Sequence, residues 1–406
     1  MIDFNHWRPI GISDLEPTAW NALRSEQNSI ITAGPGAGKT EFLTQKALYL
    51  LQTGLCSYPQ RILALSFKKD AARNLRDRVL LRINKNQSSR CDSMTYDAFA
   101  KNILDRFINS IPSEWRPSPD YRIVSLSKVQ LSNIGESADF EKRWLSKIKI
   151  GNTDAAQSIK LKQLWNELKV TSNESLLTYT MINRLAEYIL RLSPELLQAL
   201  RTTYPYVFMD EFQDTTYSQY DLIETAFYGS SSILTAVGDD KQRIMLWAGA
   251  IPNAFEQFRN RFRAQSFTLI FNHRSRPELV NIQHVIAKAI DPYIPVIQSQ
   301  ALVDIGGDFT GLWQFSHQDR EAEYLSHWIN EDMQANGLTP RDYCFLTRQK
   351  PEDIELILKP HFDSKSLLLR NESRKINDVM IQDILSEDIA IVIIDFLKLI
   401  IVGKEP

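Results

Sequence analysis

The chain has 406 residues, of which 43% are hydrophobic and 24% are charged, and its formal net charge at pH 7 is −2. This composition is ordinary for a folded globular protein with two or three domains, and it argues against a disordered chain or a strongly basic nucleic-acid-binding one. The three cysteines, Cys56, Cys91 and Cys344, form no C-x-x-C pair, which argues against a disulfide scaffold, a zinc ribbon or an iron–sulfur cluster and favours a reducing, cytoplasmic compartment.

The first predicted elements surround a glycine-rich stretch. Residues 15–23 are typical of a short helix with Pro17 in its first turn. The β-branched run 29–32 predicts a strand, and apolar residues at helical spacing after residue 40 predict a helix. Between the two lies a loop of small residues that ends in Lys-Thr: Ala33, Gly34, Pro35, Gly36, Ala37, Gly38, Lys39 and Thr40.

This loop is typical of a phosphate-binding site. Glycines allow backbone conformations in which consecutive N–H groups point at one anion, and the helix N-terminus adds a partial positive charge. We expect Lys39 to neutralise the β- and γ-phosphates of a nucleotide and the Thr40 hydroxyl to hold Mg²⁺. Ala33 departs from the usual first glycine of the pattern. The alternative, a glycine-rich turn that binds nothing, is disfavoured by the strand before the loop and the helix after it.

Two further strands are predicted to end in residues of interest. The run 61–65 leads into Ser66 and Phe67, where a helix begins, and a third such element leads to Thr95. Open α/β sheets bind ligands at the carboxyl ends of their strands. Residues 61–110 hold 11 Lys or Arg against 5 Asp or Glu. A solvated face is the commoner explanation of such an excess, and a nucleic-acid site is the alternative.

From residue 101 to residue 203, helical periodicity dominates and no buried-strand run is found. This texture predicts a helical insertion into the sheet domain. The sheet is predicted to resume at residues 206–209, followed at once by D-E-F-Q-D. Adjacent carboxylates after an apolar strand suit Mg·ATP chemistry, in which Asp210 would support the metal and Glu211 would polarise the attacking water. Because acidic clusters are also common on surfaces, this interpretation depends on the phosphate loop upstream.

The last strands of this domain are predicted at residues 233–237 and 267–271, and the second ends in Asn-His-Arg-Ser. The six histidines show no metal-ligand spacing. From about residue 277 a second α/β unit is predicted, with a helix over 279–290, a strand at 343–346 and helices to the end. The apolar run 389–402 is too short and too charged to span a bilayer. Its broad apolar face needs a surface to pack on, which indicates a domain cut short.

Together these stretches resemble the UvrD/Rep family of superfamily 1 (SF1A) DNA helicases. Residues 33–40 resemble its Walker A loop, 66–72 its T-F-T-N-K-A-A element and 95–100 its T-F-H-S-F-A element. D-E-F-Q-D is written as the family writes it, 238–250 resembles G-D-x-x-Q-S-I-Y-x-W-R-G-A, and 272–275 resembles N-Y-R-S. Six elements in one order over about 240 residues form a specific match.

The resemblance implies an α/β fold of the P-loop NTPase (RecA-like) type. Residues 1–100 and 204–276 would form the parallel sheet domain 1A, and residues 101–203 its helical insertion 1B. Residues 277–406 would form the first part of a second RecA-like domain, 2A, truncated near the family's 2B insertion. Two later family elements, T-x-H-x-x-K-G-x-E and V-A-x-T-R-A, find no counterpart in this sequence. We therefore expect the chain to be the N-terminal half of a motor.

Carried over position by position, the resemblance implies roles in nucleotide chemistry. The expected catalytic residues are Lys39, Glu211, Gln242 and Arg274. Gln242 would sense the γ-phosphate, and Arg274 would act as an arginine finger on the charge that develops in transfer. ATP would be bound by the loop 33–40 with His273, and Mg²⁺ by Thr40 and Asp210.

The resemblance also implies a track for single-stranded DNA. The expected contacts are Ser66, Phe67, Thr95, Met245 and Trp247. Phe67 and Trp247 would stack on bases, which is tolerant of sequence because every base has a π-face. Core packing is the alternative for both aromatic residues.

Several positions depart from the family pattern. Ala19 stands in place of the adenine-reading glutamine, Glu41 in place of an arginine, and His273 in place of the tyrosine of N-Y-R-S. All three would touch the base, so the resemblance does not fix selectivity for ATP over other triphosphates. Met245 replaces a stacking tyrosine and Ala248 an arginine. One DNA contact is therefore expected to be weaker, and one link between nucleotide and DNA is expected to be absent.

The favoured function is an ATP-dependent DNA helicase or translocase that acts on single-stranded DNA or on junctions of duplex and single strand, without membrane association. Family membership implies 3′-to-5′ movement. One alternative is an ATP-binding regulatory or scaffold subunit of a DNA-processing or defence complex, without translocase activity of its own. Another is a P-loop enzyme unrelated to DNA, such as a kinase, against which D-E-F-Q-D and the stretch 238–250 argue.

Overall fold

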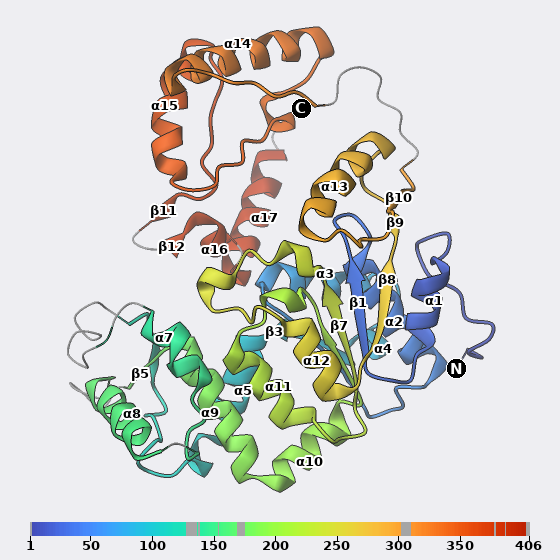
Figure 1. Cartoon of the computed structure of the whole chain (residues 1–406), viewed down its shortest axis with the longest axis vertical. Helices are drawn as coiled ribbons and strands as arrows, with labels where there is room; N and C mark the ends of the chain where they lie inside the picture. Colours follow the sequence, from blue (N-terminus) through green and yellow to red (C-terminus); the bar gives the residue numbers. More distant parts are fainter. Residues whose placement is uncertain are drawn as a thin grey trace. The chain divides into compact units, whose positions relative to one another are not determined.

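The computed structural model describes residues 2–126, 136, 139–152, 154–168, 175–301, 310–376, 379–385 and 387–402. The chain forms two compact units, Met1–Ile305 and Gly306–Pro406, and Figure 1 shows the elements of both. Every residue expected to bind nucleotide or DNA lies in the first unit.

The first unit is built on a sheet of six parallel strands (Figure 1). In spatial order they are β3 (Cys91–Thr95), β2 (Ile62–Ser66), β6 (Tyr206–Met209), β7 (Ile233–Gly238), β1 (Ser29–Ala33) and β8 (Gln265–Leu269). The predicted α/β fold with a parallel sheet is confirmed. Because the strands are parallel, their carboxyl ends share one edge, where β7 alone separates the ends of β1 and β6.

Each face of this sheet has its own apolar core, because alternate strand residues point to opposite faces. Ile31 and Ala64 lie in a core with the helices α1 (Pro17–Arg24), α2 (Lys39–Thr53) and α3 (Lys69–Leu80). Ile30 and Leu65 lie in the other core, with α5 (Tyr96–Phe107), α9 (Tyr179–Leu192), α11 (Tyr217–Phe227) and α12 (Ala254–Phe262). A short helix, α4 (Lys85–Ser88), precedes β3.

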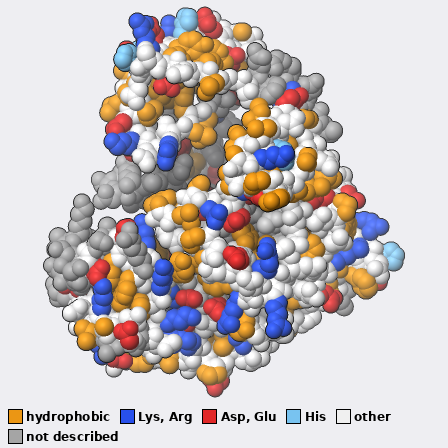
Figure 2. All heavy atoms as spheres, viewed as in Figure 1, with side chains coloured by type: hydrophobic (Ala, Val, Ile, Leu, Met, Phe, Trp, Pro, Cys, Tyr) orange, Lys and Arg blue, Asp and Glu red, His pale blue; other side chains and the backbone are white. Residues whose placement is uncertain are grey.

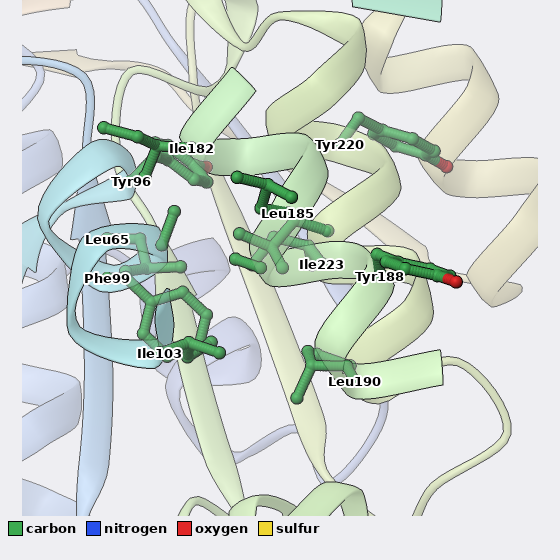
Figure 3. Close-up of a cluster of buried hydrophobic side chains, with 14 of the residues drawn as sticks. Leu65, Tyr96, Phe99, Ile103, Ile182, Leu185, Tyr188, Leu190, Tyr220 and Ile223 are labelled. Carbon is green, nitrogen blue, oxygen red and sulfur yellow. The ribbon is translucent and has the colours of Figure 1, made fainter. Parts of the chain in front are cut away.

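The predicted helical insertion continues the second of these cores. Figure 3 shows side chains of α5, α9 and α11 meeting beside Leu65 of β2. Residue 101, the predicted start of the insertion, falls inside α5, since this helix begins at Tyr96 and runs on to Phe107. The remaining elements are η1 (Ile108–Ser110), β4 (Arg122–Ile123), α7 (Phe140–Arg143), η2 (Leu145–Lys147), α8 (Ala155–Leu168), β5 (Leu176–Leu177) and α10 (Pro194–Thr203).

Two strands in the insertion were not predicted, and one predicted strand is interrupted. β4 and β5 pair in parallel, but each has only two residues, too few to show a period. The predicted strand 267–271 is wrong at its end, because β8 stops at Leu269. The buried Glu16 carboxylate accepts the N–H groups of Ile270 (3.1 Å) and Phe271 (2.8 Å). A second short strand, β9 (Phe271–Asn272), then pairs with β10 (Gln298–Ser299).

The helix predicted at 279–290 is α13 (Pro277–Ile290), which belongs to the first unit although we expected the second part to begin at residue 277. It exposes Val285 (70%) and Ile286 (61%), and hydrophobic side chains gather over this helix in Figure 2. Elsewhere on the face of the first unit in Figure 2, acidic and basic side chains are interspersed. This face of the first unit therefore shows no separate basic and acidic patches among the described residues (Figure 2).

The second unit contains α14 (Gln318–Asn336), α15 (Pro351–Ser364), β11 (Lys375–Ile376), β12 (Val379–Met380), α16 (Ile381–Leu385) and α17 (Asp388–Val402). The strand predicted at 343–346 is wrong, because these residues have no regular structure and pair with no strand among the described residues. Tyr343 and Phe345 instead pack against the small core of α14 and α15. No described helix is long and apolar enough to cross a membrane.

Candidate functional site

The predicted phosphate loop connects the carboxyl end of β1 to the first residue of α2. Gly36 and Gly38 have φ values of +75° and +77°, a left-handed conformation that glycine adopts without strain. The Lys39 ammonium donates a hydrogen bond to the carbonyl of Ala33 at 3.4 Å, so the side chain turns back across the loop. Because the loop opens onto the N-terminus of a helix of 15 residues, its backbone and its lysine both favour an anion.

The Asn-His-Arg-Ser stretch lies directly against this loop. Asn272 Nδ2 donates to the carbonyl of Pro35, and the backbone N–H of His273 donates to the carbonyl of Gly36, both at 2.9 Å. A Cβ on Gly36 would lie 2.5 Å from Asn272 Oδ1. The same oxygen accepts the N–H of Arg274 at 2.9 Å. Two stretches that are far apart in sequence are therefore joined through the buried Asn272.

Asp210 and Glu211 follow β6 at the same edge of the sheet. Asp210 is 2% exposed, and burial raises its pKa to about 6. The charge of Glu211 adds to this rise, whereas the Glu211 N–H, which donates to Asp210 at 3.0 Å, and the Lys39 ammonium lower the pKa. Because the charges of Lys39 and Asp210 act on each other, the loop and the carboxylates form one electrostatic site.

Glu211 is held in an unusual conformation. Its φ of +49° is left-handed, a strained backbone that persists only where the surroundings fix it. Gln213 Nε2 donates to the Glu211 carboxylate at 2.7 Å. Burial, followed by the charge of Glu211, also raises the pKa of Asp214 to about 6, while Lys68 acts against this rise. Three acidic groups thus lie close together.

Gln213 also links the carboxylates to the stretch 238–250. Its Oε1 accepts the N–H of Asp239 at 3.1 Å, and a Cβ on Gly238 would lie 2.1 Å from this oxygen. The buried Asp239 accepts from Gln242 Nε2 at 3.0 Å and pairs with Lys241 at 2.8 Å. Sequence reasoning did not single out Gln213 or Asp239. Both residues stand in stretches that resemble the family, Gln213 in D-E-F-Q-D and Asp239 in 238–250, and this was the signal that could have found them.

The oxygen donors expected to hold Mg²⁺ suit that ion. Thr40 offers a hydroxyl in the first turn of α2, and Asp210 offers a carboxylate at the end of β6. Mg²⁺ in nucleotide sites is held by one or two protein oxygens together with phosphates and water. The raised pKa of Asp210 means that a cation bound beside it would relieve an unfavourable charge. Among the described residues, no group of three or more His, Cys, Asp or Glu side chains could hold a metal by itself.

The residue after the loop, Glu41, is tied to α3. Its carboxylate pairs with Arg78 and with Arg82, each at 2.8 Å, and accepts from Gln45 Nε2 at 2.7 Å. The Gln45 amide also exchanges two hydrogen bonds with the backbone of Ile10, at 3.0 and 2.8 Å. At the position where the family pattern has an arginine, this chain therefore has a carboxylate, and the cations come from a neighbouring helix.

The five residues expected to contact DNA lie at or beyond the carboxyl ends of β2, β3 and β7. Ser66 is buried and Phe67 is half-buried, while the Thr95 hydroxyl accepts the N–H of Ala98 at 3.1 Å and so caps α5. Met245 is half-buried, and Trp247 is 70% exposed. Core packing, the alternative for the aromatic residues, is therefore wrong for Trp247.

The strand order, the glycine loop between β1 and α2, and the carboxylates after β6 define a RecA-like domain of the P-loop nucleoside triphosphatase class. Within that class, the chain belongs to the UvrD/REP helicase N-terminal domain family, whose sequence profile matches residues 15–263.

The chain is also similar to bacterial proteins that are named as DNA helicases. It is 30% identical over 290 residues to a probable DNA helicase II homolog of Mycoplasma capricolum, covering 64% of this chain and 38% of the relative. It is 24% identical over 340 residues to the ATP-dependent DNA helicase Rep of Escherichia coli, covering 79% and 49%. It is 27% identical over 343 residues to the ATP-dependent DNA helicase PcrA of Staphylococcus aureus, covering 79% and 45%. The chain spans about half or less of the length of these three relatives.

Proposed function

We propose that this chain is the N-terminal motor part of an ATP-dependent DNA helicase or translocase that acts on single-stranded DNA. The observation that carries this proposal is the meeting of three sequence stretches at one sheet edge: the loop 33–40, Asp210 with Glu211, and the stretch 272–274. The names of the relatives support a DNA helicase, and the proposal extends that activity to a protein containing this chain.

In the proposed reaction, the loop N–H groups and the Lys39 ammonium hold the phosphates of ATP. Thr40 and Asp210 would hold Mg²⁺, which when bound neutralises charge on the β- and γ-phosphate oxygens. Glu211 acts as the general base that orients the attacking water and takes its proton. The hydrogen bond from Gln213 keeps the Glu211 carboxylate in one orientation.

Three further residues are proposed to read the nucleotide. Gln242, tethered to Asp239, would contact the γ-phosphate. Arg274 would stabilise the charge that develops in transfer, because Asn272 fixes its backbone beside the loop. His273 Cδ2 lies 3.9 Å from the position of a Cβ on Gly38, and we propose that the His273 ring contacts the nucleobase of the bound nucleotide.

The DNA track is proposed to cross the same sheet edge. Phe67 and Trp247 would stack on bases, with Met245 beside them, and Ser66 and Thr95 would lie near the DNA backbone. The exposure of Trp247 supports this role directly. Movement from 3′ to 5′ and action at junctions of duplex and single strand are proposed from the family resemblance alone.

A pair of substitutions in the complete protein tests the catalytic assignment. Glu211→Gln keeps a hydrogen-bonding group at this position and removes the base, so ATP should still bind while DNA-stimulated hydrolysis falls by about 100-fold or more. Lys39→Ala should abolish hydrolysis by weakening phosphate binding. Glu256→Gln, on the exposed surface of α12, is the matched control and should hydrolyse ATP at the wild-type rate. Unchanged turnover in Glu211→Gln would contradict the assignment.

The second candidate is an ATP-binding regulatory or scaffold subunit without turnover of its own. The observation that favours it is Glu41, a carboxylate paired with Arg78 and Arg82 at the position of the family's arginine. Nucleotide binding with negligible hydrolysis by the complete protein in the presence of DNA would support this candidate. Rapid hydrolysis would exclude it.

A further inference from the structure

An exposed apolar turn follows residues 238–243, the stretch that Gln213 links to Glu211. Ile244 is 71% exposed, Leu246 is 46% exposed and Trp247 is 70% exposed. Trp247 lies in η5 (Leu246–Ala248), a single turn that ends at Gly249 with a φ of +93°. A large aromatic ring that is this exposed retains surface on which a planar ligand could stack.

A lysine of the helical insertion packs on this turn. The ammonium of Lys142, in α7, lies 5.3 Å from the centre of the Trp247 ring. A Cβ on Gly249 would lie 3.5 Å from Lys142 Cβ and 3.6 Å from Lys142 Cγ. The aliphatic part of the lysine therefore crosses the turn at Gly249, and its charged end reaches the indole. Both ends of the side chain have a defined place.

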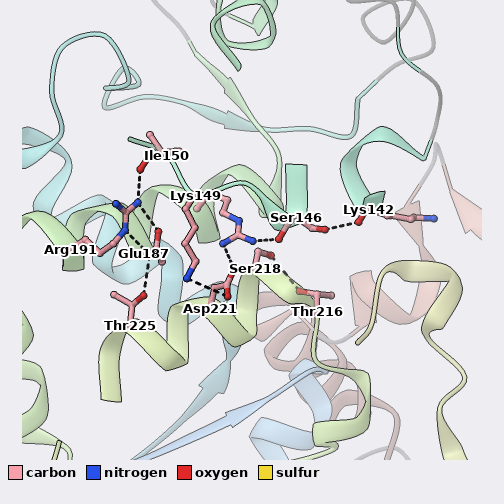
Figure 4. A network of polar contacts seen from close by, with 11 residues as sticks. Lys142, Ser146, Lys149, Ile150, Glu187, Arg191, Thr216, Ser218, Asp221 and Thr225 are labelled. Carbon is pink, nitrogen blue, oxygen red and sulfur yellow. Dashed lines mark hydrogen bonds and ion pairs between the residues drawn. The ribbon is translucent and has the colours of Figure 1, made fainter. Parts of the chain in front are cut away.

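A network of hydrogen bonds and ion pairs, which Figure 4 shows, holds the segment that carries Lys142. Ser146 Oγ donates to the carbonyl of Lys142 at 2.6 Å, and the guanidinium of the fully buried Arg184 donates to the carbonyl of Ser146. Arg184 also pairs with Asp221 at 2.7 Å, and Lys149 lies 3.6 Å from the same carboxylate. The segment that carries Lys142 is thus bonded to Arg184 of α9, another helix of the insertion, and through Arg184 to Asp221 of α11.

In Figure 4 the side chain of Lys142 points away from this network. Within the described part of the chain, no carboxylate oxygen lies within 4.0 Å of the Lys142 ammonium. An ammonium carries three donors and no acceptor, so this one retains capacity for an anion. A cation beside an exposed aromatic ring is the combination that proteins use for the phosphate and the base of a single strand.

We propose that Lys142 and Trp247 form one binding unit for a nucleotide of single-stranded DNA, with the base stacked on the indole and a phosphate on the ammonium. This inference rests on the proposed function and adds to it a binding residue from the helical insertion. It makes Arg184 and Asp221 positioning residues, because they act only by holding the segment that carries Lys142.

The test is equilibrium binding of a fluorescein-labelled oligothymidylate to the whole chain over a range of salt concentrations. Lys142→Met should reduce the slope of log affinity against log salt by about 0.7, the contribution of one phosphate contact to a single strand. At about 0.1 M salt this corresponds to a loss of affinity of about five-fold. Lys142→Arg keeps the charge and should keep both slope and affinity.

Two further variants complete the experiment. Lys162→Met removes an exposed lysine elsewhere in the insertion, one that pairs with Glu114 at 3.5 Å, and should bind as the wild type does. Trp247→Ala should weaken binding, and the double variant with Lys142→Met should lose less than the product of the two single losses, because the two groups act as a unit.

The outcomes separate the two proposals. If the wild-type chain binds the oligonucleotide and Lys142→Met keeps its slope and affinity, the Lys142 assignment is overturned while the proposed function stands. If Lys142→Arg loses as much slope as Lys142→Met, charge is not what Lys142 contributes, and the assignment is likewise overturned. If the wild-type chain and the complete protein both fail to bind single-stranded DNA, the proposed function itself fails.

Discussion

Replacing Asp210 by asparagine should stabilise the nucleotide-free protein. In the folded chain this carboxyl is buried and its pKa is raised from 3.8 to about 6. One pKa unit corresponds to about 1.4 kcal/mol, so keeping the group ionised above pH 6 costs the folded state about 3 kcal/mol. The asparagine side chain would keep the oxygen that accepts the Glu211 N–H, so little is lost in exchange. We expect Asp210→Asn to raise the free energy of unfolding by about 1–3 kcal/mol.

The sign of the pH dependence follows from the same pKa. Because the folded-state pKa is the higher one, the folded state binds the proton more tightly, and stability falls as pH rises from about 4 to about 6. Near pH 5 about half of the cost is already relieved. The wild-type protein should therefore gain stability between about pH 7.5 and pH 5, and Asp210→Asn should gain less. Asp214, whose pKa is also raised to about 6, contributes to the pH dependence of the free energy of unfolding in both proteins.

Urea unfolding of the nucleotide-free chain at these two pH values measures the effect. Glu256→Gln is the control, because this carboxylate is exposed on α12. Asp210→Asn should also lose Mg²⁺-dependent hydrolysis in the complete protein, so a gain in stability would accompany a loss of function. An Asp210→Asn chain that is less stable than the wild type at the higher pH would refute the reasoning.

Two more substitutions follow from the structure. Gly36→Ala should lower the free energy of unfolding by about 1–3 kcal/mol and weaken nucleotide binding, because φ is +75° and the new Cβ would lie 2.5 Å from Asn272 Oδ1. Gly34→Ala is its control, because a Cβ on Gly34 would have no neighbour within 4 Å. Equal losses of stability in urea unfolding would contradict the packing argument. Lys46→Met should raise the free energy of unfolding near pH 7, because burial lowers the pKa of Lys46 to about 7 in the folded chain, whereas in the unfolded chain this amine stays protonated below about pH 10.5. The free energy of unfolding of the wild type should therefore rise between pH 7 and pH 9, and that of the variant should not. Parallel pH profiles of the two proteins in urea unfolding would count against a buried neutral amine.

The sequence was most informative where a local pattern determines the structure. The loop 33–40 could be predicted because glycines, a strand and a helix each leave a local signature, and the structure confirms all three. The strands at 206–209 and 233–237 were equally clear, since strands buried in a parallel sheet form short continuous apolar runs.

Predictions failed where an element depends on a distant partner. The stretch 343–346 is apolar enough for a strand, yet it pairs with no strand in the described structure and packs as an irregular segment. β8 ends early because the carboxylate of Glu16, about 250 residues earlier in the sequence, accepts hydrogen bonds from the next two N–H groups. Neither outcome has a local signal.

The supporting contacts of the candidate site were missed for the same reason. Gln213 matters because it holds Glu211 and Asp239 together, and Asn272 because it is bonded to the carbonyl of Pro35. The sequence identified the groups proposed for chemistry, whereas the side chains that hold them could be recognised only from the folded chain. The roles of the chemical groups themselves stay predictions that the experiments above test.

The rate of ATP hydrolysis by the complete protein, with and without single-stranded DNA, tests directly whether this chain belongs to a DNA motor. We expect hydrolysis to rise with added single-stranded DNA and to disappear in both Lys39→Ala and Glu211→Gln. Hydrolysis that is indifferent to DNA, or that survives in Glu211→Gln, would contradict the claim that this chain carries the nucleotide site of a DNA motor.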